Sequence, residues 1–128
     1  SSAASDVYKR QDVQPLFLQR FRKEIKNHEI EFDFALSGED ALEYLHEKHN
    51  EVVLILSDIN MPGMSGIELL SRIRNEYKIP PPLVMMVTAY GDEQNYQQAM
   101  QHGANDFLTK PLDFALLKDK LKNLPNHD

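Results

Sequence analysis

Short runs of apolar residues divide this chain at regular intervals. Residues 52–57 and 83–88 lack an alternation of polar and apolar positions, which predicts strands buried on both faces of a sheet. Residues 106–109 form a third predicted strand. Residues 30–34 differ because apolar and acidic positions alternate there, which predicts a half-exposed strand at a sheet edge. We therefore expect one sheet with both buried and edge strands.

Apolar residues at helical spacing fill the intervals between these strands. The predicted helices cover residues 12–27, a stretch opening at residues 37–40, and residues 65–77, 92–101 and 113–123. Within the third of these, the residues that recur at helical spacing are Ile67, Leu70, Ile73 and Arg74. Gly103 is expected to end the fourth helix in a left-handed conformation. Strands that alternate with helices favour an α/β fold, in which helices cover both faces of a parallel sheet.

The composition narrows the class of protein. With 128 residues, 41% of them hydrophobic and 27% charged, the chain is long enough for one domain with a sizeable core. The net charge of −6 and the lack of a basic run disfavour nucleic-acid binding. The absence of cysteine excludes disulfides and thiolate metal sites. No apolar stretch has the length that a bilayer requires, so we expect a cytoplasmic protein without membrane contact.

Three reactive side chains stand where predicted strands end. Asp58 follows the run 52–57 and precedes a loop rich in Pro and Gly, Thr88 ends the next strand, and Lys110 follows residues 106–109. The carboxyl ends of parallel strands lie at one edge of a sheet, where open α/β folds place their chemistry. An acid, a hydroxyl and an amine would then meet there. That grouping suits the binding of a phosphoryl group on the acid.

Each of these residues also has an ordinary structural explanation. Asp58 could be a turn residue, Thr is common at strand ends, and Lys110 alone would be a solvated lysine. Phe107, judged in isolation, is a core residue. The five histidines are spread over separate elements, with no pair at positions i and i+4, and are assigned no metal role. The functional interpretation of the three strand-end residues is favoured because they occur together in register.

Taken together, these motifs resemble the receiver domain of two-component response regulators. The resemblance covers about residues 12–122, and the motifs that carry it are Asp58 with Met61–Gly66, Thr88–Ala89, Gly103–Leu108 and Thr109–Pro111. It implies a flavodoxin-like, doubly wound sheet of five parallel strands in the order 2-1-3-4-5, in which the first strand of this chain is atypical. It also implies a regulatory phosphoacceptor domain rather than an enzyme. The expected partner is a sensor histidine kinase or a phosphotransfer protein.

The resemblance implies a role for each site residue. Asp58 would accept a phosphoryl group from a phosphohistidine, Thr88 would bond a phosphoryl oxygen, and Lys110 would pair with the phosphorylated acid. Phe107 would change rotamer as Thr88 moves. Mg²⁺ would be held by Asp58 and by the backbone carbonyl of Asn60.

The resemblance also implies an output face, made of the helix at 92–101, the strand at 106–109 and the helix at 113–123. An output domain, or a second copy of the chain, could bind there. The peptide bond between Lys110 and Pro111 would be cis, as is usual in the family.

The first eleven residues depart from the family pattern. Receiver domains carry an acidic pair that holds Mg²⁺ at the end of the first strand, and the corresponding positions here are about Tyr8 and Lys9. Residues Asp6–Gln11 match the translation of a transposon-end adapter used in sequencing, so residues 1–11 are interpreted as non-native. The alternative is a degenerate receiver that lost its acidic pair. The domain itself is expected over residues 12–123, followed by a tail or the start of a linker at 124–128.

Three other functions remain to be compared with phosphate acceptance. The chain could be a pseudo-receiver that binds a partner without phosphorylation, with Lys9 near Asp58 in place of the metal. An aspartate-based phosphatase is disfavoured because Asn60 stands where its second acid is needed. A flavin domain is disfavoured because no phosphate-binding loop follows the first-strand position.

Overall fold

The computed structural model describes residues 14–35, 37–48, 50, 52, 54–61, 63–78, 81–89 and 91–124. The chain divides into two compact units, Ser1–Leu36 and Ser37–Asp128. The second unit contains the parallel sheet. The predicted first-strand segment, with Tyr8 and Lys9, lies outside the described residues, as do residues 125–128 of the predicted tail.

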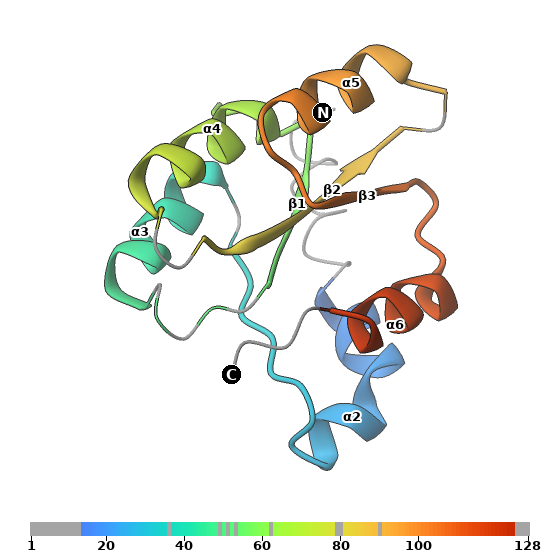
Figure 1. Cartoon of the computed structure of the whole chain (residues 1–128). Helices are drawn as coiled ribbons and strands as arrows, with labels where there is room; N and C mark the ends of the chain where they lie inside the picture. Colours follow the sequence, from blue (N-terminus) through green and yellow to red (C-terminus); the bar gives the residue numbers. More distant parts are fainter. Residues whose placement is uncertain are drawn as a thin grey trace, which may run out of the picture. The chain divides into compact units, whose positions relative to one another are not determined.

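The sheet consists of three parallel strands in the described part of the chain. They are β1 (Leu54–Asp58), β2 (Leu83–Thr88) and β3 (Asp106–Thr109), and they lie in the order β1-β2-β3 (Figure 1). The register aligns Asp58 with Val87 and Thr88 with Thr109, so the carboxyl ends of all three strands share one edge. This arrangement confirms the expected α/β class with a flavodoxin-like parallel sheet. The three strands take the last three places of the expected five-strand order.

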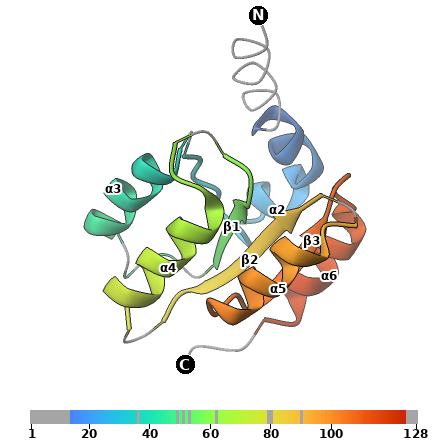
Figure 2. The ribbon, with the colours of Figure 1, turned by 90° about the horizontal axis from the view of Figure 1, so that it is seen from above.

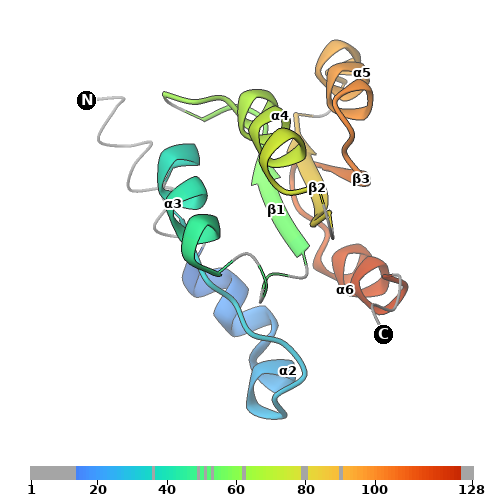
Figure 3. The ribbon, with the colours of Figure 1, turned by 60° about the vertical axis from the view of Figure 1, so that its left-hand side comes forward.

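In the described part of the second unit, four helices cover the sheet. Their bounds are α3 (Gly38–Lys48), α4 (Gly66–Glu76), α5 (Glu93–Gln101) and α6 (Phe114–Lys122). Helices α3, α4 and α5 lie on one face and α6 lies on the other (Figures 2 and 3). All six residues of β2 are buried because helices cover this central strand from both sides.

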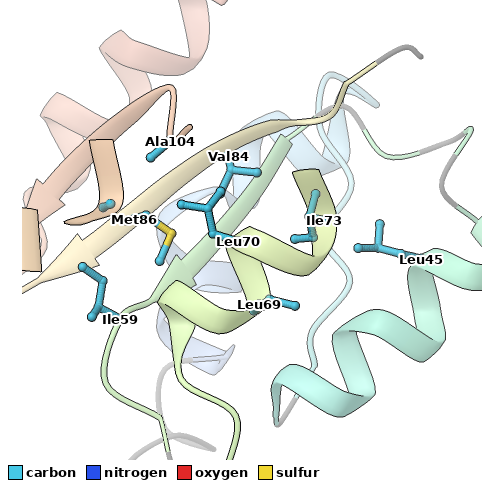
Figure 4. Close-up of a cluster of buried hydrophobic side chains, with 9 residues drawn as sticks. Leu45, Ile59, Leu69, Leu70, Ile73, Val84, Met86 and Ala104 are labelled. Carbon is cyan, nitrogen blue, oxygen red and sulfur yellow. The ribbon is translucent and has the colours of Figure 1, made fainter. Parts of the chain in front are cut away.

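The main core lies between the sheet and helices α3, α4 and α5 (Figure 4). Its buried members are Leu45, Ile59, Leu69, Leu70, Ile73, Val84, Met86, Ala99 and Ala104. Alternate residues of β2 contribute to it, as expected when successive side chains of a strand point to opposite faces. Leu117 of α6 is buried and lies outside this cluster.

Polar side chains start all four of these helices. The side chains of Ser37, Ser65, Asp92 and Asp113 each accept a hydrogen bond from the backbone N–H three residues later, which is the usual N-cap. After α5, Gly103 has φ of 98°, as the sequence predicted. Helix and strand bounds in this unit therefore agree with the predicted ones to within about two residues.

The first unit differs from its prediction in two ways. Residues 14–20 are helical, but the helix is interrupted at Phe21 before α2 (Arg22–Lys26) begins. The strand predicted at 30–34 was wrong, because residues 30–35 form no strand. A strand requires a hydrogen-bonded neighbour, and the alternating pattern alone does not supply one.

Aromatic packing accounts for the alternation of residues 30–34. The rings of Phe32 and Phe34 both contact Phe17, with centroid distances of 5.6 and 6.3 Å. Phe32 also packs on Phe21 at 4.9 Å. The two rings occupy one side of the extended segment, so period two places the side chains correctly without a strand partner.

Candidate functional site

Asp58 ends β1 with its carboxylate held on both oxygens. Lys110 Nζ lies 2.5 Å from Oδ2, and the backbone N–H of Asn60 donates to Oδ1 at 3.0 Å. The side chains of Asp58 and Lys110 keep exposed fractions of 33% and 49%, so a small anion can reach this pair from solvent. The carboxylate is therefore both oriented and accessible.

Lys110 reaches Asp58 across the end of the central strand. It directly follows β3, and its backbone N–H donates to the Thr88 carbonyl at 2.8 Å. The Lys110–Pro111 peptide bond is cis. Since β2 lies between β1 and β3, the ammonium group spans the end of β2 to meet Asp58. The parallel sheet thus brings the predicted acid and amine together.

Thr88 lies between them at the end of β2 and is only 2% exposed. The register aligns its neighbour Val87 with Asp58, which places Thr88 one residue beyond the carboxylate along the same sheet edge. The hydroxyl predicted for the site therefore belongs to the same edge as the acid and the amine. Thr88 differs from these two residues in being buried.

Phe107 lies on the face of the sheet that α5 covers. Its register partner is Met86, a member of the main core, and its ring packs on Tyr96 of α5 with centroids 4.2 Å apart at an angle of 56°. Both aromatic residues are half-buried. Sequence reasoning missed Tyr96, since α5 contains few large apolar residues that would mark an inward face.

The loop after Asp58 returns directly to the end of β1. The Gly66 N–H donates to the Ile59 carbonyl at 2.8 Å, and a Cβ at position 66 would lie 2.2 Å from the Asp58 carbonyl oxygen. Only glycine permits this approach of helix α4 to the strand. The loop is also bonded to α3, because the Met64 N–H donates to Glu39 Oε1 at 3.0 Å. Sequence reasoning did not single out Glu39.

These contacts define what the site can do chemically. An oriented carboxylate can act as an oxygen nucleophile toward phosphorus, and a fixed ammonium can stabilise the charge on the transferred group. The Asp58–Lys110 pair is partly exposed, so it contributes little to stability, roughly 0–1 kcal/mol. Lys110 can therefore exchange the carboxylate for a phosphoryl oxygen at small energetic cost.

The donors expected for Mg²⁺ form a weak set in the part of the chain that the structure describes. No group of three His, Cys, Asp or Glu side chains is close enough there to hold a metal ion. Asp58 provides one carboxylate, which Lys110 already contacts, and Asn60, an exposed residue, would provide its backbone carbonyl. Mg²⁺ is usually held by one or two carboxylates with phosphate oxygens and waters. These residues alone fit a tightly held ion poorly.

Among the described helices, none combines the length and the apolar character needed to cross a bilayer.

Comparisons with known proteins agree on one family. The sequence model described as "Response regulator receiver domain" matches residues 12–122. Response regulator RppA of Synechocystis sp. is 33% identical over 80% of this chain and 43% of its own length. Chemotaxis protein CheY-3 of Vibrio cholerae is 33% identical over 80% of this chain and 82% of its own.

Solved structures give the same result. The crystal structure of a response regulator receiver domain protein from Clostridium thermocellum superposes with a TM-score of 0.71 at 28% identity, covering 85% of each chain. The chain spans 43% of RppA and 20% of Two-component response regulator ARR11 of Arabidopsis thaliana. The sequence match over residues 12–122 and the shared fold together show that this chain belongs to the response regulator receiver domain family of two-component signalling.

Proposed function

We propose that the chain accepts a phosphoryl group on the carboxylate of Asp58 from a sensor histidine kinase or a phosphotransfer protein. The observation that carries the proposal is the contact of 2.5 Å between Asp58 Oδ2 and Lys110 Nζ at an accessible sheet edge. The Asn60 N–H bond to Oδ1 supports it by fixing the orientation of the carboxylate. Membership of the receiver family supports the phosphohistidine donor.

The transfer conserves charge and atoms without a redox step. A carboxylate oxygen of Asp58 forms a bond to phosphorus, the phosphorus–nitrogen bond of phosphohistidine breaks, and the imidazole leaves with the electron pair. The acyl phosphate that results carries about −1.5 to −2 charge, which Lys110 partly balances. Water later hydrolyses the acyl phosphate, releasing inorganic phosphate and restoring the carboxylate.

The switch that follows would couple charge to packing. A phosphoryl oxygen on Asp58 would draw the hydroxyl of Thr88 toward it, and Phe107 would move into the space that Thr88 leaves. The contact of Phe107 with Tyr96 extends this change to α5. The output face of α5, β3 and α6 would then bind an output domain or a second copy of the chain differently in the two states.

The extent of the functional domain is also part of the proposal. The family match begins at residue 12, which supports the interpretation that residues 1–11 are not part of the receiver domain. The similarity to Hybrid signal transduction histidine kinase M of Dictyostelium discoideum supports placement in a phosphorelay. No contact among the described residues favours the alternative of a phosphorylation-independent binding module.

The test is a mass measurement after incubation with acetyl phosphate and Mg²⁺. The chain should gain one phosphate, and Asp58→Asn should gain none because an amide cannot form the acyl phosphate. Asp119→Asn is the matched control, since Asp119 is an exposed acid on α6 and should leave the gain intact. No gain in the wild type, or the same gain in Asp58→Asn, would overturn the proposal.

A further inference from the structure

The start of helix α3 is fitted to the loop that follows Asp58. Glu39 accepts a hydrogen bond of 3.0 Å from the backbone N–H of Met64. Gly63, with φ of 74°, would place a Cβ 3.3 Å from the Glu39 carboxylate, and Gly38 would place one 3.1 Å from the Met64 side chain. Close approach at three neighbouring positions shows that Glu39 and this loop are packed together.

Hydrogen bonds link the position of this loop to the orientation of the Asp58 carboxylate. At its start, the Ile59 N–H donates to Val87, and at its end the Gly66 N–H donates to Ile59, at 3.0 and 2.8 Å. Asn60 lies between these anchors, and its N–H orients the Asp58 carboxylate. A restraint on Met64 therefore limits how far Asn60 can move relative to Asp58.

An acid in the first turn of a helix has an ordinary role, which is to interact with the helix dipole. Asp40 occupies the same turn of α3 and is also exposed. The backbone N–H groups of Glu39 itself and of Met64 hold the pKa of the Glu39 carboxyl below its usual value. Glu39 differs from Asp40 in its hydrogen bond to Met64. Replacing each residue in turn therefore distinguishes an effect on the helix dipole, which both acids share, from the loss of the restraint on the loop, which only Glu39 provides.

We propose that Glu39 is a positioning residue for the phosphorylation of Asp58, acting through the Met64 N–H to hold the 60–65 loop. This inference rests on the proposed function of Asp58. The Glu39 side chain does not touch the reacting atoms. Its effect comes from keeping the Asn60 N–H aimed at the carboxylate, so it should appear in the rate of phosphorylation.

The experiment compares Glu39→Ala, Glu39→Gln and Asp40→Ala with the wild type under acetyl phosphate. Glu39→Ala should phosphorylate about three- to tenfold more slowly, the range expected from losing one hydrogen bond. Glu39→Gln should recover most of the rate, since its amide oxygen can still accept the Met64 N–H. Asp40→Ala should match the wild type. Equal rates for Glu39→Ala and Asp40→Ala, or no recovery in Glu39→Gln, would overturn the proposal.

Amide hydrogen exchange of the unphosphorylated protein gives a second, independent measurement. Glu39→Ala should speed the exchange of the Met64 and Asn60 amides, whereas Asp40→Ala should not. Unchanged exchange at both amides would refute the restraint. A wild-type chain that gains no phosphate would instead count against the proposed function, and the exchange measurement would still decide whether Glu39 holds the loop.

Discussion

Replacing Gly66 with alanine should destabilise the protein at the point where the strand that carries Asp58 meets helix α4. The added Cβ would lie 2.2 Å from the Asp58 carbonyl oxygen and 2.6 Å from Ile59 Cα. Both contacts are with backbone atoms, which cannot rotate away as a side chain can. Either the helix must move away from the strand or the strand end must shift.

The expected size of this effect follows from opposing contributions. Overpacking of a dense interior costs about 1–3 kcal/mol, and the rigid backbone contacts put Gly66→Ala near the top of that range. The preference of a helix for alanine over glycine returns up to about 1 kcal/mol. We expect a net loss of roughly 2 kcal/mol or more in the free energy of unfolding, which lowers Tm by about 5–10 °C for a chain of this length.

Gly38→Ala is the matched control. Gly38 and Gly66 are both buried first residues of helices of 11 residues. The Cβ at position 38 would meet Met64 Cβ and Sδ at 3.1 Å, a milder contact than the one at position 66, and a shift of a few tenths of an ångström would relieve it. We expect a change within about 1 kcal/mol. Urea denaturation of the two variants tests the argument, and equal stability would show that the Gly66 contact does not constrain the loop.

Three other predictions follow from particular contacts. Arg74→Met should lower the free energy of unfolding, measured by urea denaturation, by about 2–3 kcal/mol. The reason is that the guanidinium donates hydrogen bonds to the carbonyls of Gly103 and Pro82 and to Asn105 Oδ1. An unchanged midpoint of the urea denaturation curve would contradict this prediction. Lys110→Ala should slow phosphorylation by acetyl phosphate at least about tenfold, yet change the free energy of unfolding by less than about 1 kcal/mol. A purely structural role for Lys110 would instead give a loss of stability without a specific loss of phosphorylation rate. Backbone N–H bonds depress the pKa of Glu39 from its usual 4.5, so the charge stabilises the fold above that pH, and its contribution is lost as pH falls through the depressed pKa. The stability difference between wild type and Glu39→Gln should therefore shrink in denaturation curves taken at progressively more acidic pH, and a constant difference would refute the assignment.

The sequence alone determined most of the second unit. The bounds of β2 and β3 were predicted to the residue, because continuous apolar character and turn residues depend on local burial, which the sequence records directly. The meeting of Asp58 and Lys110 was also predictable. Parallel strands joined by helices bring their carboxyl ends to one edge whatever the details of packing.

Tertiary structure decided the contacts between residues that are distant along the chain. Helical spacing grouped Arg74 with the apolar face of α4, but its guanidinium bonds Gly103 and Asn105, 29 and 31 positions away. The bond of Glu39 to Met64 spans 25 positions and left no periodic signal. The segment 30–34 shows the converse. Its alternating pattern predicted which side chains lie on one side and pack together, but the strand inferred from that pattern is absent. Periodicity reports which face of an element is buried, whereas the partner on that face is fixed only when the elements pack.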